Sequence, residues 1–171
     1  MGLLDKLTGT RRPTNGTAPR PAAEVHAGLL GLGGPDVPYV VRDGRAEGAD
    51  LVAEWRILDP AWRTFFVRTQ VSSVFRVRMR LVPEKHAVRA LDEQYDVTWA
   101  GETPSLALSA EARRGQVRTV STRRTLGGAD GHADDGSDGT FRFDSADLKT
   151  PLQETVLAAG WTWRGVVSGR L

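Results

Sequence analysis

Three arginines alternate with apolar residues over residues 74–81, and this run carries the clearest candidate chemistry in the chain. Side chains of a strand alternate between its two faces, so Arg76, Arg78 and Arg80 share one face and the apolar residues share the other. Neighbours on one strand face lie about 6.6 Å apart, close to the spacing of successive phosphates. The three arginines are therefore anion-binding candidates. The alternative, which we favour, is a solvated face whose arginine stems cover apolar surface.

A loop rich in aspartate and glycine, residues 130–138, has the composition of a site for a hard cation. It departs from the calcium-loop pattern, which places ligands at fixed positions of a twelve-residue loop. Counted from Asp134, Gly136 stands where a second ligand is needed, and Ser145 stands where the bidentate glutamate is needed. We expect a solvated loop, and weak cation binding stays open.

No other motif specifies a reaction. Asp92, Glu93 and Asp96 lie close together in the sequence, but a charged strand edge explains them without catalysis. The three histidines lack the paired spacing of a metal site or a catalytic dyad, and the chain has no cysteine. No nucleophile elbow, phosphate loop or dinucleotide fingerprint occurs. We therefore assign no catalytic residue, no metal ligand and no cofactor.

Five tryptophans are many for 171 residues, and most of them fall at alternating, strand-like positions. They are Trp55, Trp62, Trp99, Trp161 and Trp163. We expect them to fill the core, with a tryptophan-lined ligand pocket as the alternative.

The elements that position these residues begin near residue 37. Short alternating runs separated by glycine- and proline-bearing turns predict seven or eight antiparallel strands. Asp59-Pro60 predicts a helix start, and Thr150-Pro151 with Gln153 predicts a capping box at the start of a C-terminal helix that stops at Gly160. The fold class is α+β, with a strongly curved antiparallel sheet or barrel and a C-terminal helix packed on or in it.

Residues 1–36 are expected to form a mobile N-terminal tail, and residues 37–171 a single domain. Leu3, Leu4 and Leu7 form a short apolar stripe that needs a partner surface to hold a helical form. No run is long and apolar enough for a membrane span and no secretion signal is evident, so we expect a cytoplasmic location.

Three stretches carry a resemblance to a known group: residues 1–9, residues 49–56, and residues 151–153 with 159–165. Together they resemble a family of small actinobacterial proteins, and this resemblance implies no activity. The order of strands, helix and closing strand is also loosely similar to the tubby and LURP-one barrel. That similarity implies a barrel related to phosphoinositide-binding and scramblase-related proteins.

The sequence thus supports three hypotheses. The first is a non-enzymatic binding or scaffold domain, with Leu3, Leu4 and Leu7 docking on an unknown protein partner. The second is an anionic-lipid-binding barrel that uses Arg76 and its two neighbours on the same strand face, with the same leucine stripe as an interfacial anchor. The third is an enzyme or small-ligand carrier with a tryptophan-lined pocket. Nucleic acid is disfavoured as a partner, because Phe75 alternates onto the face opposite the arginines and so cannot stack bases between them.

Overall fold

The computed structural model describes residues 8–109, 121–124, 141–167 and 171. Its centre is a six-stranded sheet in the order β1-β2-β3-β4-β5, with β8 beside β4. The strands are β1 (Tyr39–Asp43), β2 (Leu51–Trp55), β3 (Ser73–Val82), β4 (Ala87–Ala100), β5 (Thr103–Leu108) and β8 (Thr162–Val166). Two further strands, β6 (Ser121–Arg124) and β7 (Phe141–Asp144), pair with each other.

The predicted α+β class, with an antiparallel sheet and a C-terminal helix, is confirmed. The barrel alternative is wrong, because the described strands form an open sheet with β1 at one edge and β5 and β8 along the other. β8 also departs from the antiparallel pattern and runs parallel to the first part of β4. The helix α5 (Ser145–Ala158) precedes β8 and provides the long crossover that a parallel pairing needs.

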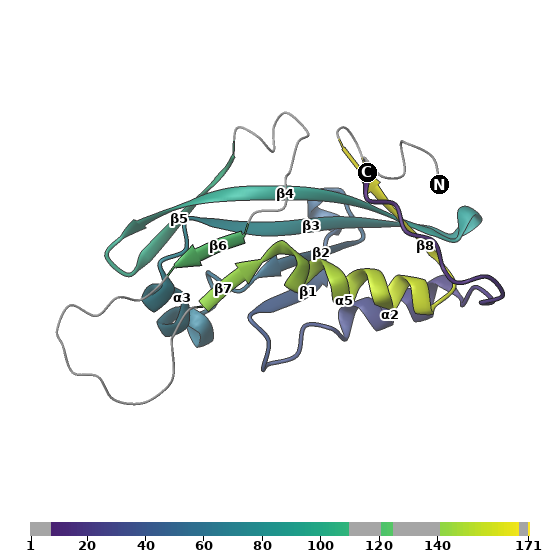
Figure 1. Cartoon of the computed structure of the whole chain (residues 1–171), viewed down its shortest axis with the longest axis horizontal. Helices are drawn as coiled ribbons and strands as arrows, with labels where there is room; N and C mark the ends of the chain where they lie inside the picture. Colours follow the sequence, from purple (N-terminus) through teal and green to yellow (C-terminus); the bar gives the residue numbers. More distant parts are fainter. Residues whose placement is uncertain (1–7, 110–120, 125–140, 168–170) are drawn as a thin grey trace.

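Two helices, α2 (Ala22–Leu30) and α5, lie together against one face of the sheet, which we call the inner face (Figure 1). Buried aliphatic and aromatic side chains fill the space between these layers. They include Val25, Leu29, Leu51, Val77, Met79, Leu148, Leu152, Trp161 and Trp163. The tryptophans therefore contribute mainly to the core, as expected. Because α2 belongs to this core, the packed body begins well before residue 37.

The C-terminal helix starts earlier than the capping-box pattern predicts. α5 begins at Ser145, so Pro151 lies inside the helix instead of in its first turn. Leu148, one turn before the proline, is fully buried, and this packing favours extending the helix past a residue that cannot donate its backbone hydrogen bond. The predicted end is confirmed at Gly160, which has φ of +74°.

The short helices follow the sequence signals more closely. Asp59 accepts a hydrogen bond from the Ala61 backbone N–H at the start of η2 (Pro60–Trp62), which leads directly into α3 (Arg63–Thr69). Two further single turns, η1 (Arg45–Glu47) and η3 (Pro83–Lys85), connect β1 to β2 and β3 to β4. None of the described helices is long and apolar enough to cross a membrane.

Candidate functional site

The outer face of the sheet, opposite the two helices, carries most of its charge. Strand alternation places Arg76, Arg78 and Arg80 of β3 on this face, while Val77 and Met79 point into the core. The predicted division of β3 into an arginine face and an apolar face is therefore correct.

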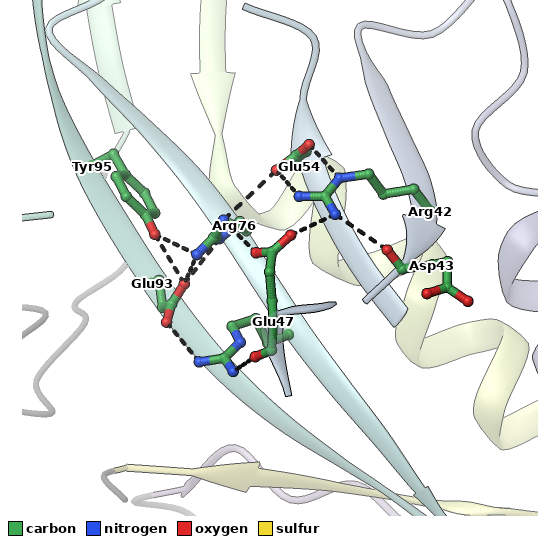
Figure 2. A network of polar contacts seen from close by, with 8 residues as sticks. Arg42, Asp43, Glu47, Glu54, Arg76, Glu93 and Tyr95 are labelled. Carbon is green, nitrogen blue, oxygen red and sulfur yellow. Dashed lines mark hydrogen bonds and ion pairs between the residues drawn. The ribbon is translucent and has the colours of Figure 1, made fainter. Parts of the chain in front are cut away.

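Six charged side chains on this face form what we call the charge network (Figure 2). The network comprises Arg42, Glu47, Glu54, Arg76, Arg78 and Glu93. Strand register builds it, because Arg76 of β3 stands opposite Glu54 of β2 on one side and Glu93 of β4 on the other. Opposite charges directly across a sheet stabilise the pairing.

Arg76 is the centre of the charge network. Its Nε donates to Glu93 Oε2 at 2.9 Å, and its Nη1 donates to Glu47 Oε2 at 2.8 Å. Its Nη2 donates to Glu93 and to the Tyr95 hydroxyl, and the guanidinium carbon also lies 4.8 Å from the centre of the Tyr95 ring. Five contacts to three side chains hold this guanidinium in one orientation.

Arg42 closes the charge network on the β1 side. It donates to both carboxylate oxygens of Glu54, from Nε at 2.7 Å and from Nη2 at 3.1 Å, which is the bidentate geometry of a strong charged pair. Its Nη1 lies 2.6 Å from Glu47 Oε1. Glu47 therefore bridges Arg42 and Arg76, although it comes from η1 and not from a strand (Figure 2).

The other two anion-binding candidates also have protein partners. Arg78 donates to Glu93 Oε1 at 3.3 Å and to the backbone carbonyl of Glu47. Arg80 donates to the backbone oxygens of Leu171 at 2.9 Å and Gly48 at 2.8 Å. The structure thus shows what orients each arginine, and anion binding along β3 stays a prediction.

The surroundings in the charge network shift the pKa of Glu47, of Arg42 and of the adjacent Tyr95. Partial burial acts to raise the pKa of Glu47, but the hydrogen bond from Arg42 and the charges of Arg76 and Arg78 outweigh it and lower that pKa. Burial raises the pKa of the Tyr95 phenol. The pKa of Arg42 is raised further above its usual value, chiefly by its hydrogen bond to Glu54. Near neutral pH these groups keep one charge state, which suits positioning more than proton transfer.

A hollow of about 310 Å³ opens beside the charge network, and we call it the network hollow. Its apolar lining comes from strands β1, β2, β3 and β5 and from the segment after β2, and includes Val40, Trp55, Ile57, Leu58, Val74, Phe75 and Leu106. Its polar lining is Arg42, Glu54, Arg56, Asp59, Arg76 and Tyr95. Only one of the five tryptophans lines it, so this is not the tryptophan-lined pocket of the sequence analysis.

Strand alternation places Glu93 on the face of β4 opposite Asp92 and Asp96. Asp92 faces the helix layer and is paired with Lys149 of α5, while Glu93 joins the charge network. Burial raises the pKa of Asp92, against the effect of Lys149. Asp96 is exposed. No group of three or more potential metal ligands comes together in the part of the chain that the structure describes.

Comparisons with protein-family models, with curated proteins and with solved structures found no match. The resemblances to actinobacterial proteins and to the tubby and LURP-one barrel therefore stay predictions. The residues predicted to dock on a partner, Leu3, Leu4 and Leu7, lie outside the described residues, and so does the aspartate-rich loop 130–138.

Sequence reasoning missed Arg42, Glu47, Glu54 and Tyr95. A usable signal existed for the β3–β4 pair, because the turn at residues 83–86 fixes its register. Counting outward from that turn places Glu93 opposite Arg76. No comparable signal pointed to Glu47, whose position depends on the turn between β1 and β2.

Proposed function

We propose that this protein is a non-enzymatic binding domain that holds a small, mainly apolar ligand in the network hollow. The observation that carries the proposal is an apolar hollow whose charged wall is already ordered by ion pairs. Binding sites for small molecules are typically concave and mostly apolar, with a few fixed polar groups. A wall that is ordered before binding loses little conformational entropy when the ligand enters.

The contacts of the wall indicate the ligand's chemistry. The donors of Arg42 and Arg76 are directed to carboxylates of the protein, and those of Arg56 to Asp59 and backbone carbonyls. A ligand oxyanion would have to compete with these internal partners. The apolar side chains Val74 and Leu106 offer no such competition, so an uncharged ligand fits the hollow best.

In the described part of the chain, no specific contact supports two other hypotheses from the sequence. They are docking of a protein partner through Leu3, Leu4 and Leu7, and an enzyme with a tryptophan-lined pocket. A cytoplasmic location remains part of this proposal, since the chain lacks the cysteines that are typical of small secreted domains.

The proposal is tested by filling the hollow. Leu106 lines it and is 37% exposed, whereas Leu30 on α2 is 39% exposed and lies outside it, so Leu106→Trp and Leu30→Trp form a matched pair. Native mass spectrometry of protein purified gently from its own cells should show an added small mass. We expect that mass with the wild type and Leu30→Trp, and its loss with Leu106→Trp.

A bare chain mass for the wild type would overturn the proposal, and so would an added mass that Leu106→Trp retains. A co-purifying protein in place of a small molecule, lost when residues 1–20 are deleted, would instead favour docking through Leu3, Leu4 and Leu7. Melting temperatures of both tryptophan variants verify that they are folded.

A further inference from the structure

A row of three arginines crosses the outer face at the end of the sheet nearest β8. Register places Arg80 of β3 opposite Arg89 of β4, and Arg89 opposite Arg164 of β8. We call these three residues the arginine row. Residues directly opposite one another on neighbouring strands have Cα atoms only about 5 Å apart, and two like charges at such positions destabilise the sheet. Strand pairing alone therefore gives no reason for this arrangement.

The arginine row borders a second hollow, of about 420 Å³, which we call the row hollow. Its positively charged lining consists of Lys85, Arg89 and Arg164, and none of the described residues that line it is a carboxylate. The remaining lining is Thr8, Val82, Ala87, Gly165, Val166 and Val167. Positive charge and apolar side chains thus share one concave surface.

Two of the three cations that line the row hollow are available to a ligand. Lys85 and Arg164 are exposed, and neither forms an ion pair or a side-chain hydrogen bond within the described part of the chain. Arg80, a member of the arginine row that does not line the hollow, is oriented by the backbone oxygens of Gly48 and Leu171. Within the described residues, the anchored Arg80 thus lies near two cations, Lys85 and Arg164, that have no carboxylate partner.

The wall of the row hollow is closed by a close backbone contact. A Cβ atom at Gly165 would lie 1.6 Å from the carbonyl oxygen of Thr8, so only glycine lets this N-terminal segment lie against β8. The bridge between Arg11 and Trp163 holds the same segment in place. The hollow is thus formed by strands and by a segment bonded to them.

We propose that the row hollow binds the phosphate group of a ligand that also has an apolar part. Arg89, Arg164 and Lys85 supply positive charge from three separate segments, and guanidinium groups match the geometry of phosphate oxygens. Val166 and Val167, the latter 45% exposed, offer the apolar contact. The site is separate from the network hollow and does not depend on the function proposed there.

A phosphate group with an apolar part can come from a membrane lipid or from a free organic phosphate. The experiment uses two probes to separate these sources: vesicles of phosphatidylglycerol, with phosphatidylcholine vesicles as the neutral reference, and inorganic pyrophosphate in solution. Vesicle binding is measured by flotation and pyrophosphate binding by calorimetry, both at one fixed ionic strength because charge interactions are screened by salt.

The variants are Arg164→Gln and Lys85→Gln, with Arg63→Gln as the matched control. Arg63 is also an exposed arginine, but it lies on α3 and outside the row hollow. We expect binding of at least one probe to weaken about tenfold with Arg164→Gln and with Lys85→Gln, because each removes one charge-assisted hydrogen bond. Binding should be unchanged with Arg63→Gln. The melting temperature without a probe should not fall in Arg164→Gln.

Binding of the anionic vesicles alone would support a lipid headgroup, and binding of pyrophosphate alone would support a soluble phosphate. The proposal is overturned if neither probe binds, or if Arg164→Gln and Arg63→Gln weaken binding equally, because that would indicate attraction by the overall charge. Equal flotation with neutral vesicles would also overturn it for lipids.

Discussion

Strand β3 carries arginines at both ends of the outer face, but these arginines have different cross-strand partners. In the charge network, three arginines face three glutamates, and Arg76 has an acid directly opposite on both neighbouring strands. In the arginine row, Arg80 has Arg89 opposite, and Arg89 has Arg164 opposite. The role of an arginine on this face is thus decided by its cross-strand partner more than by its own strand.

Burial makes this difference matter for stability. The side chains of Arg76 and Glu93 are 20% and 13% exposed, so their charges are partly removed from water. A pair in such a position stabilises little compared with an apolar pair, but losing one partner leaves a costly unpaired charge. Arg164 at the other end is exposed, and water satisfies it at low cost. The charge network therefore belongs to the folded framework, whereas the arginine row does not need to.

The largest effect is expected from Glu93→Gln. This carboxylate accepts from both Arg76 and Arg78, and a neutral amide leaves two half-buried guanidinium groups without its charge. We expect the free energy of unfolding to fall by about 2 kcal/mol. Urea denaturation at neutral pH measures it.

The matched control for that variant is Glu84→Gln. Glu84 is an exposed carboxylate in η3, so the same change of charge and size should alter the free energy of unfolding by less than about 0.5 kcal/mol. Equal losses in the two variants would contradict this prediction, since the Glu93 carboxylate would then contribute no more to stability than the exposed carboxylate of Glu84.

A smaller effect should appear in the pH dependence of stability. The folded state holds the pKa of Glu47 below its ordinary value of 4.5, so near that pH the folded chain binds fewer protons than the unfolded chain. The resulting stability is present above pH 4.5 and is lost as the pH falls through the folded pKa. We expect Glu47→Gln to be less stable than the wild type by about 1 kcal/mol at pH 7, with a difference that shrinks below pH 4.5.

Urea denaturation at a series of pH values from neutral to acidic checks this prediction. Arg164→Gln serves as the contrast, because an arginine does not titrate in that range, and its difference from the wild type should stay flat. A constant difference for Glu47→Gln would mean that its carboxylate gains nothing from Arg42 and Arg76.

The strands and the faces of this protein are readable from its sequence, because both follow from short-range alternation. The division of β3 into arginines and core residues is an example, and so is the Asp59 cap before η2. The start of α5 was not readable, because burial of Leu148 outweighs the proline signal at 151. Local pattern is reliable until long-range packing opposes it.

Only some residues of the candidate sites could be predicted from the sequence, for a related reason. The sequence indicated Arg76, Arg78 and Arg80, but a site on a sheet runs across strands as well as along them. The partner Glu93 follows from the hairpin register, whereas Arg164 joins the row only because α5 returns the chain beside β4. That parallel pairing has no short-range sequence signal.

The smallest expected effect is a gain in stability from Arg164→Glu. This change replaces the like-charged cross-strand pair of Arg89 and Arg164 with an oppositely charged pair. The arginine row would then have the kind of pairing that the charge network already has. We expect the free energy of unfolding to rise by about 0.5 kcal/mol in low salt, and the gain to shrink in high salt. Arg164→Gln should show about half of it. A loss of stability in both variants would mean that Arg164 is needed for folding, and the two ends of the outer face would then differ in their partners but not in their role.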